Sequence, residues 1–563
     1  MTLLRAPITV PRHLANSPFA ANNFIMDSVT YSFQLDERNE PELCQFAEIL
    51  AASLRPGDLL ALSGDLGAGK TTFARAVIRA LTGNPAEEIP SPTFTLVQTY
   101  ETPRMPVAHF DLYRLSDPEE LMELGLEDLL KSGVCLVEWP EHGGDLMPSE
   151  RMSISIGDAA SGRQQFRDVY ISGHGVFAER ARRLERIVGL LHDSGWGGNK
   201  TSVAYLQGDA STRRYARVFR SASSTAAEIP VAQHTVAQHA TAILMDWPRQ
   251  PDGPPIRDGQ PYSRIAHLAE DVRPFVAIAR ALRDAGLAAP EIFANDLDDG
   301  LLLIEDFGDR VYGRELADNA DQAELWQAAI DVLVHLRSFP TDKPLPIGDG
   351  TAWTLSRYDA AAMKIEIELL ADWLWPFATG VEMPAGLRAQ FCELWRDTIA
   401  SLQDMPSGWV LRDFHSPNLI WRPDRQGLAR VGVIDFQDAM QGPQAYDVAS
   451  LLHDARVDVP QDLEKQLLDN YCAAAAATGP AFDDENFRYA YAALCAQRNT
   501  KILGIFARLH ERDGKPHYVA HMPRIWGYLA RALQHPHLAA LKSFYDAHVF
   551  TLQGRRKDNL RSP

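Results

Sequence analysis

Short apolar runs and helical periodicities alternate along the first third of the chain. Residues 58–62 form an apolar strand pattern, and residues 71–81 continue as a helix that should end near Gly83. Residues 151–172 then alternate between apolar and polar positions, which is typical of a closing hairpin. Further strands, each with polar residues at its end, are expected at 91–96, 109–114 and 134–140. Strands separated by helices predict an α/β domain.

A charged amphipathic helix over residues 178–191 begins a different pattern. Its apolar positions recur at helical spacing, and they are Leu184, Ile187, Val188 and Leu191. The arginines between them are interpreted as a solvent-facing surface. We therefore place a domain junction near Phe177, without a long linker.

The length of the chain agrees with more than one folding unit. At 563 residues, it is too long for one ordinary hydrophobic core. The prediction is a poorly ordered tail followed by two domains, at 1–26, 27–178 and 179–555. Within the second domain we expect a small lobe over about 179–308 and a large lobe over about 309–555.

The composition narrows the classes of partner. A formal net charge of −19 disfavours a broad attachment to nucleic acid or to an anionic membrane, because that attachment needs clustered Lys and Arg. No run approaches eighteen apolar residues, and prolines interrupt the N-terminal stretch, so neither export nor a membrane span is expected. Five cysteines, scattered and odd in number, indicate neither a disulfide framework nor a zinc site. These features fit a cytoplasmic protein.

Residues 64–71 carry the most specific motif, a phosphate loop with the sequence G-D-L-G-A-G-K-T. It stands between the expected strand 58–62 and the expected helix 71–81, which is the required order. Glycines let backbone N–H groups converge on phosphate oxygens at a helix N-terminus, Lys70 adds a charge, and the Thr71 hydroxyl can ligate magnesium. The candidate ATP-binding residues are Gly64, Asp65, Gly67, Ala68, Gly69, Lys70, Thr71 and Thr72.

A phosphate-loop ATPase also needs a carboxylate at the end of a neighbouring strand to organise magnesium. Glu138 meets that description best, since an apolar run ends there. Asp111 is a second carboxylate in a similar setting, and Thr93 or Thr95 is a candidate sensor of the terminal phosphate. An isolated acidic residue at a strand end is more often a turn or a cap, but the accompanying phosphate loop reverses that preference.

Four segments together resemble the TsaE family of small ATPases, which work with partner proteins in making threonylcarbamoyladenosine in transfer RNA. They are, in order, G-D-L-G-A-G-K-T-T-F, S-P-T-F, H-x-D-x-Y-R and a hydrophobic strand closing in E-W. The resemblance implies that Lys70 and Thr71 bind phosphate and magnesium, and that Glu138 and Asp111 serve the metal and the attacking water. It also implies that Trp139 lies beside the nucleotide, with simple core packing as an equal alternative.

The same resemblance implies partners for the first domain. They are the threonylcarbamoyl transferase and its partner subunit, while transfer RNA is involved only indirectly. The ATPase of this family resets or activates the transferase assembly and does not itself transfer the group. The acidity of the chain agrees with that adjunct role.

A second, unrelated set of phosphoryl-transfer residues lies far downstream. Residues 412–418 contain R-D-x-x-x-x-N, and residues 434–436 read I-D-F. Transfer of a phosphoryl group to a hydroxyl needs a base for the incoming oxygen and two groups that hold metal. Asp413 is the expected catalytic base, and the expected metal ligands are Asn418, five positions later, and Asp435, beyond one hairpin.

This second half resembles the aminoglycoside phosphotransferase superfamily, a two-lobed, protein-kinase-like α+β fold that acts on small molecules. The closer similarity is to AmgK, a branch of anomeric kinases of N-acetylmuramate and N-acetylglucosamine. The segments that carry it are G-D-A-S-T-R-R-Y from 208, L-R-D-F-H-S-P-N from 411, I-D-F-Q-D-A from 434, Q-R-N-T-K-I-L-G from 497, and residues 508–515. The two resemblances imply ATP and Mg²⁺ as cofactors, and an amino sugar as the substrate of the second half.

Two departures from the superfamily pattern matter. Leu411 replaces the histidine that usually precedes the catalytic aspartate, but that position is structural and activity need not suffer. The strand lysine that normally grips the α- and β-phosphates is absent, and Met245 stands where it is expected. Candidate nucleotide-binding residues in the turn that begins at 208 are Ser211, Arg213 and Arg214, with Arg217 as a further source of charge. Asp447 is expected to be a structural contact beneath the catalytic loop.

The favoured interpretation is a fusion of two enzymes without shared chemistry, a tRNA-modification ATPase and a cell-wall amino-sugar kinase. One alternative is that the second half phosphorylates an aminoglycoside or another small alcohol. A cationic drug needs an acidic pocket, whereas the lactyl carboxylate of muramate needs a cation, which Arg498 with Lys501 fits. A non-enzymatic alternative is that one half is a regulatory ATP-binding module.

Overall fold

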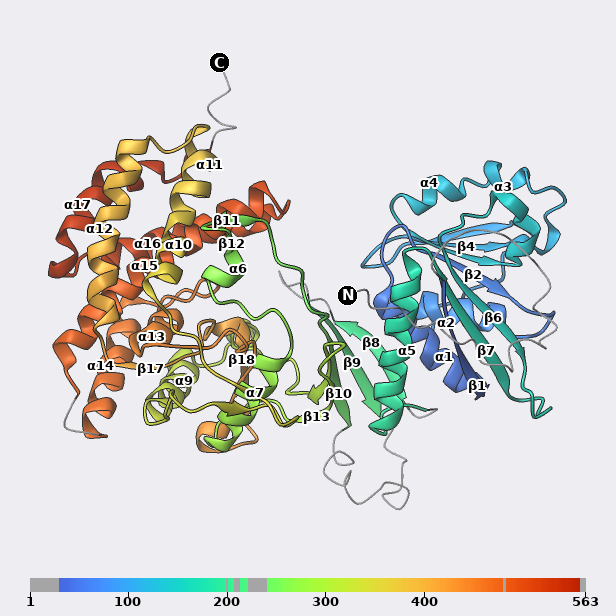
Figure 1. Cartoon of the computed structure of the whole chain (residues 1–563), viewed down its shortest axis with the longest axis horizontal. Coiled ribbons are helices and arrows are strands. Elements are labelled where there is room, and N and C mark those ends of the chain that lie inside the picture. The colour runs from blue at the N-terminus through green and yellow to red at the C-terminus, as the bar shows by residue number, and fades with distance from the viewer. Residues whose placement is uncertain (1–29, 199–200, 207–212, 221–239, 479–481, 557–563) are drawn as a thin grey trace, which may run out of the picture. The chain divides into compact units, whose positions relative to one another are not determined.

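The chain folds into two compact units, Met1–Tyr205 and Leu206–Pro563 (Figure 1). The structure is a computed structural model that describes residues 30–198, 201–206, 213–220, 240–478 and 482–556. This division falls later along the chain than the junction expected near Phe177.

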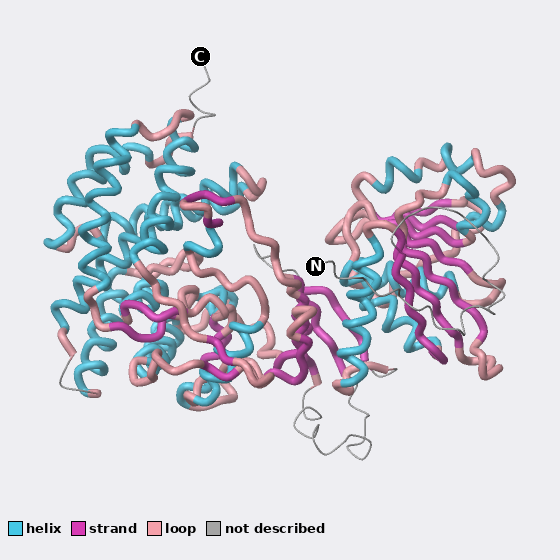
Figure 2. Tube along the Cα trace, viewed as in Figure 1, coloured by secondary structure: helices cyan, strands magenta, loops and turns pink. Residues whose placement is uncertain are grey.

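A seven-stranded sheet of order β1-β7-β6-β2-β5-β4-β3 forms the first unit (Figure 2). Its strands are β1 (Thr30–Arg38), β2 (Leu59–Ser63), β3 (Val97–Tyr100), β4 (Val107–Asp111), β5 (Val134–Glu138), β6 (Met152–Asp158) and β7 (Arg167–His174). Its helices are α1 (Glu40–Ser53), α2 (Lys70–Thr82), α3 (Glu120–Glu123), α4 (Leu126–Leu130) and α5 (Phe177–Asp193). The central strands β6, β2, β5 and β4 pair in parallel with their neighbours. At the two edges the pairing is antiparallel, β6 with β7 and β7 with β1 on one side and β4 with β3 on the other. The α/β prediction, including the closing hairpin β6–β7, is confirmed.

Helix α5 is held to the first unit by burial and by an ion pair. The apolar face predicted within 184–191 is largely buried, and the helix packs against β1 and β7. Arg180 pairs with Asp58 through two contacts of 2.5 Å between guanidinium nitrogens and carboxylate oxygens. A Cβ atom at Gly173 of β7 would overlap the backbone of Phe177, so strand and helix can approach closely there. The helical period predicts that one face of α5 is buried, but it does not identify β1 and β7 as the strands that bury it.

The expected strand over residues 91–96 is wrong. The N–H of Leu96 donates to the carbonyl of Pro92 at 2.7 Å, and this hydrogen bond closes a turn. The hydroxyls of Ser91 and Thr93 donate to Asp111. Ser and Thr side chains that bond elsewhere compete with strand pairing, so local alternation is a weak signal at this position.

A five-stranded sheet of order β13-β14-β10-β9-β8 comes next along the chain, and the boundary between the two units falls within its edge strand β8. Its strands are β8 (Thr201–Leu206), β9 (Arg214–Arg220), β10 (Thr241–Asp246), β13 (Ile292–Asp296) and β14 (Leu301–Glu305). Helix α7 (Arg273–Asp284) buries a continuous apolar face in the core of this unit. This sheet and helix α7 lie within residues 179–308, where a small lobe was predicted, and the lobe boundary stays a prediction.

A mostly helical large lobe follows (Figure 2). Its main helices are α8 (Tyr312–Ala317), α9 (Gln322–Leu336), α10 (Ala360–Leu369), α11 (Trp375–Thr379), α12 (Ala385–Gln403), α13 (Ala445–Leu452), α14 (Gln461–Ala477), α15 (Asp484–Glu511), α16 (Met522–Ala532) and α17 (Ala539–Phe544). Two short antiparallel strand pairs frame the loop over residues 411–418. They are β17 (Ser407–Val410) with β20 (Met440–Pro443), and β18 (Leu419–Trp421) with β19 (Val431–Val433). Short elements that complete the unit are β11 (Pro255–Arg257), β12 (Gln260–Pro261), α6 (Tyr262–Ile265), β15 (Leu345–Pro346) and β16 (Ala352–Trp353).

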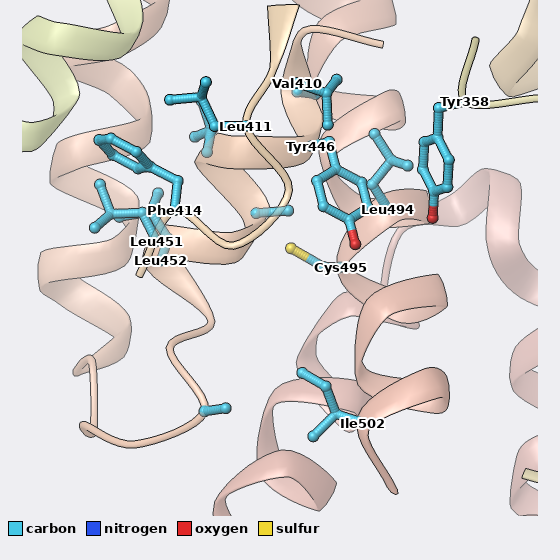
Figure 3. Close-up of a cluster of buried hydrophobic side chains, with 14 of the residues drawn as sticks. Tyr358, Val410, Leu411, Phe414, Tyr446, Leu451, Leu452, Leu494, Cys495 and Ile502 are labelled. Carbon is cyan, nitrogen blue, oxygen red and sulfur yellow. The ribbon is translucent and has the colours of Figure 1, made fainter. Parts of the chain in front are cut away.

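Apolar side chains of the 411–418 loop are anchored in the hydrophobic core of the second unit (Figure 3). Leu411 and Phe414 are each 1% exposed and belong to the same core as Leu452 of α13 and Leu494 of α15. The leucine that departs from the superfamily pattern therefore serves packing, as expected for a structural position.

Helix α15 and the end of α10 approach so closely that only glycine fits between them. A Cβ atom at Gly504 would overlap the backbone carbonyl of Leu369. Backbone cannot rotate away as a side chain does, so any larger residue must push the helices apart.

We expect Gly504→Ala to destabilise the second unit by about 1–3 kcal/mol, despite the higher helix propensity of alanine. Gly527→Ala is a matched control, because Gly527 lies in helix α16 with no atom within 4 Å of the added Cβ. That control should leave stability unchanged or raise it by up to about 1 kcal/mol. Calorimetric unfolding of both variants measures the difference, and equal stability of the two would contradict the close approach.

Candidate functional site

Three glycines shape the phosphate loop between β2 and α2. Gly64, Gly67 and Gly69 have φ of +138°, +82° and +111°, conformations that side chains with a Cβ rarely adopt. Gly64 also lies so close to the carbonyl of Ile156 that a Cβ would clash. Gly69 caps the N-terminus of α2, where backbone N–H groups are free to bind an anion.

The loop opens onto a cavity of about 300 Å³. Its lining unites residues predicted from distant segments, namely Gly67, Gly69, Lys70, Thr71, Thr72, Thr93, Asp111, Glu138 and Trp139. Gly64 and Asp65 contribute backbone carbonyls nearby, and Ala68 is buried under the loop. Thr95 is exposed and does not line the cavity, so Thr93 is the threonine that the fold brings to the site.

Lys70 is held in position by two carbonyls and one aromatic ring. Its Nζ donates to the carbonyl of Gly64 at 2.6 Å and to that of Asp65 at 2.9 Å, and lies 3.6 Å from the ring centroid of Trp139. Burial lowers the pKa of Lys70, while the charges of Glu138 and other acidic neighbours oppose that shift. Trp139 lines the cavity and also packs against a hydrophobic cluster, while its place beside a nucleotide stays a prediction.

Glu138 joins the phosphate loop to the sheet. One carboxylate oxygen accepts from the Thr71 hydroxyl at 2.8 Å, and the other lies 2.8 Å from Nε2 of His109. Asp111 is its register partner on the parallel strand β4 and accepts from the hydroxyl of Thr93 at 2.7 Å. Each carboxylate ends a strand, as the sequence predicted, and the structure adds that these two strands are neighbours.

His109 is a site residue that the sequence analysis did not assign. It is fully buried, and no hydrogen-bond partner of its Nδ1 is found among the residues that the structure describes. A strand alternates its faces, so His109 shares a face with Asp111 two positions later. The two-residue spacing between His109 and Asp111 is the sequence feature that could have identified His109 as a site residue.

The 411–418 loop brings together the three residues expected for phosphoryl transfer. The amide of Asn418 donates to the backbone carbonyl of Asp413 at 2.9 Å and to a carboxylate oxygen of Asp435 at 3.4 Å. Arg412 and Asp435 have φ of +75° and +61°, and such strain persists only where the surroundings impose it. The β18–β19 hairpin separates Asn418 from Asp435, as predicted.

A buried charge network supports this loop. Glu366 of α10 is fully buried and pairs with Arg412 and with Lys501 of α15, whose Nζ lies at 2.7 Å. The phenol of Tyr358 donates to it at 2.5 Å and the amide of Gln497 at 3.0 Å. Despite burial, these partners hold the pKa of Glu366 at about 2. The carboxylate is therefore ionised at neutral pH.

Asp447 contacts the same loop from the opposite side. Its carboxylate accepts the backbone N–H of Leu411 at 2.6 Å and that of Arg412 at 2.9 Å. Asp447 is thus the structural contact beneath the loop that the sequence predicted. Burial alone would raise the pKa of Asp413, but the opposing effects of His415 first, and then of Lys501 and Arg412, outweigh burial and lower the pKa.

Adjacent arginines of the small lobe reach different carboxylates. Arg213 pairs with Asp435, and its guanidinium lies 4.9 Å from the ring of Trp247. Arg214 instead pairs with Asp246 at 2.7 Å. Arg217 binds a third set, Asp306 and Asp309. Met245 is fully buried in the core, and the Ser211 candidate lies outside the described residues.

Neither site resembles a preformed metal cage. Within the described ranges, no group of three or more His, Cys, Asp or Glu side chains is arranged to hold a metal. Magnesium sites commonly use one or two carboxylates completed by water and phosphate oxygens, which is the donor set that each site offers. In the same ranges, no helix is long and apolar enough to cross a bilayer.

Two phosphate-handling sites in separate units define a P-loop ATPase joined to a kinase-like phosphotransferase. The family model for threonylcarbamoyl adenosine biosynthesis protein TsaE matches residues 37–166, and that of the phosphotransferase enzyme family matches residues 197–485. The chain belongs to the TsaE family in its first unit and to the phosphotransferase enzyme family in its second.

Characterised relatives match each region. An N-acetylmuramate/N-acetylglucosamine kinase of Caulobacter vibrioides is 39% identical over 346 residues, which covers 61% of this chain and 91% of the relative. The tRNA threonylcarbamoyladenosine biosynthesis protein TsaE of Rickettsia bellii is 44% identical over 118 residues, covering 21% of this chain and 81% of the relative. Among solved structures, a choline/ethanolamine kinase family protein of Mesorhizobium loti is 14% identical, with a TM-score of 0.39, and the match covers 65% of this chain and 98% of that one.

We expect Glu366→Gln to lower the stability of the second unit by about 3–5 kcal/mol at pH 7, because two buried cations lose their counter-charge. In the wild type, the depressed pKa of Glu366 stabilises the fold above its unfolded value near 4.5, and this contribution is lost as pH falls toward 2. The variant should lack that part of the acid sensitivity. Urea denaturation at pH 7 and pH 4 measures both effects.

The matched control for this substitution is Glu393→Gln. Glu393 pairs with Arg396 on the surface, and both side chains are 67% exposed. Its loss should change stability by no more than about 0.5 kcal/mol at either pH. A Glu366→Gln variant as stable as this control would show that the buried network does not hold the loop.

Proposed function

We propose that the chain is a bifunctional enzyme. The first unit hydrolyses ATP in support of threonylcarbamoyladenosine formation in tRNA, and the second phosphorylates the anomeric hydroxyl of N-acetylmuramate or N-acetylglucosamine in cell-wall sugar recycling. The observation that carries the proposal is that each unit brings together its own set of candidate phosphoryl-transfer residues. They are Lys70, Thr71 and Glu138, and Asp413, Asn418 and Asp435.

The geometry of the first unit supports ATP hydrolysis. The N-terminus of α2 and Lys70 supply positive charge for the phosphates. Asp111, fixed by the hydroxyls of Ser91 and Thr93, is the carboxylate placed to orient water, and Glu138 orients Thr71. The partners would be the threonylcarbamoyl transferase and its companion subunit, with tRNA engaged only through them.

The geometry of the second unit supports transfer to a hydroxyl. The pKa of Asp413 lies below its ordinary value, so this carboxylate is ready to accept a proton at neutral pH. An anomeric hydroxyl is more acidic than an ordinary sugar alcohol, which suits a carboxylate base. Arg213, next to Asp435, is the residue that we propose in place of the missing strand lysine.

Magnesium fits both sites. When bound with ATP, it would neutralise charge on the transferring phosphoryl group. Thr71 and Glu138 would hold it in the first unit, and Asn418 and Asp435 in the second. We place both activities in the cytoplasm, which the free thiols of all five cysteines support.

Reciprocal substitutions test the two-enzyme proposal. Lys70→Ala should abolish ATP hydrolysis by the first unit and leave sugar phosphorylation intact. Asp413→Asn should lower sugar phosphorylation at least about a hundredfold, the usual scale for a lost general base, with ATP binding little changed. Each variant is the folding control for the other, and both activities are measured on the full chain. Loss of both activities in either folded variant would refute independent sites.

The position of the new phosphate tests the sugar-kinase assignment. The product from N-acetylmuramate should be a sugar 1-phosphate, because Asp413 is expected to activate the anomeric hydroxyl. Phosphorus NMR should then show coupling of the phosphorus to the anomeric proton. Phosphate found only at the primary hydroxyl, or no reaction with any N-acetylated amino sugar in a panel that includes aminoglycosides and choline, would refute the assignment.

A further inference from the structure

One face of helix α15 carries a row of basic side chains beside the phosphoryl-transfer loop. At about 100° per residue, Arg498, Lys501 and Arg508 fall within a quarter of the helix circumference. A basic row near a phosphoryl-transfer site is suited to binding an acidic substrate, provided that the charges are not already neutralised. The three residues differ in that respect.

Lys501 and Arg498 are already engaged. Lys501 forms an ion pair with Glu366 at 2.7 Å, so its charge balances the network under the loop. Arg498 is 4% exposed, and its guanidinium donates to the backbone carbonyl of His453 at 3.4 Å. Arg498 and Lys501, which the sequence suggested as the binding site of a substrate carboxylate, therefore already form interactions within the protein interior.

Arg508 differs from both residues in its side-chain partners. Its Nε is buried without a hydrogen-bond partner, and within the described residues no carboxylate pairs with it. Asp513, a carboxylate that acts electrostatically on Arg508, is bound by Arg512 at 2.6 Å. Burial lowers the pKa of Arg508, which is the expected effect on a cation that lacks a counter-charge. A partly buried, unpaired guanidinium is costly and becomes favourable when an anion binds.

Tyr262 connects Arg508 to the reacting end of the site. Its ring lies 5.7 Å from the Arg508 guanidinium, and its phenol lies within the electrostatic reach of Glu366, Lys501 and Arg412. Arg412 adjoins Asp413, so Tyr262 lies between Arg508 and the charged groups that surround the 411–418 loop. Arg508 lies about two helical turns beyond Lys501, or about 10 Å along the axis.

We propose that Arg508 binds the carboxylate of an acidic amino sugar while the anomeric hydroxyl of that sugar meets Asp413. Arg508 is therefore the residue that favours an N-acetylated sugar bearing a lactyl carboxylate over its neutral counterpart. This inference rests on the proposed sugar-kinase function. The guanidinium fork matches a carboxylate through two parallel N–H donors, which a lysine does not reproduce.

The test compares N-acetylmuramate, which carries the carboxylate, with N-acetylglucosamine, which lacks it, as acceptors for the full chain. Arg508→Gln should lower kcat/KM for N-acetylmuramate at least about tenfold, the scale of one charge-assisted hydrogen bond, chiefly through KM. The same variant should keep kcat/KM for N-acetylglucosamine within about twofold, which also reports a correct fold. Arg512→Gln is the matched control, since Arg512 ends the same helix with a 57% exposed side chain, and should change neither value.

Equal losses for both sugars, or no loss for either, would overturn the role of Arg508 while leaving the kinase assignment intact. If the wild type phosphorylates neither sugar, the kinase assignment itself fails and the inference falls with it. Should Arg508→Gln not fold, Arg508→Lys decides the matter. Loss of at least about twofold for N-acetylmuramate alone supports the inference, and an unchanged or equally shifted pair of values overturns it.

Discussion

The second unit depends on one buried carboxylate. Glu366 lies at the meeting point of helix α10, helix α15 and the 411–418 loop, and it compensates the charges of Arg412 and Lys501 together. Arg412 adopts a left-handed backbone conformation immediately before Asp413. Such a conformation is maintained only when both ends of the residue are fixed, and here Glu366 fixes its side chain while Asp447 fixes its N–H. The position of Asp413, the proposed base, therefore depends on charged groups that are remote from it in the sequence.

In the first unit, Glu138 is the buried carboxylate that connects separate elements, as Glu366 does in the second. It joins a helix, through Thr71, to the neighbouring strand, through His109. In both units, a single carboxylate uses both of its oxygens on groups from different elements, and nearly all of its surface is buried. A site built in this way is rigid before substrate arrives, which is the condition under which fixed charges act most strongly on a transition state.

Motifs that are contiguous in sequence were predictable, and contacts between distant segments were not. The phosphate loop and the spacing of Asp413, Asn418 and Asp435 encode their own local geometry, so they are found where expected. The Arg412–Glu366 pair joins residues 46 positions apart, and the local sequence around either residue does not predict its partner. Likewise, Arg213 pairs with Asp435, 222 positions away, whereas Arg214 lies opposite Asp246 in the β9–β10 register, and neither partner is encoded by the local sequence.

Helix α15 rigidly connects the two ends of the proposed acceptor site, because it carries both Lys501, which supports the 411–418 loop, and Arg508. Its 28 residues contact the loop's counter-charge at Lys501, lock against α10 at Gly504, and carry Arg508 beyond that lock. The span between base and guanidinium is consequently set in steps of about 1.5 Å per residue. A change of acceptor length would require an insertion or deletion within the helix, which would also rotate its basic face by about 100° per residue. Point substitutions can tune affinity here, but the size of the sugar is set by the register of the helix.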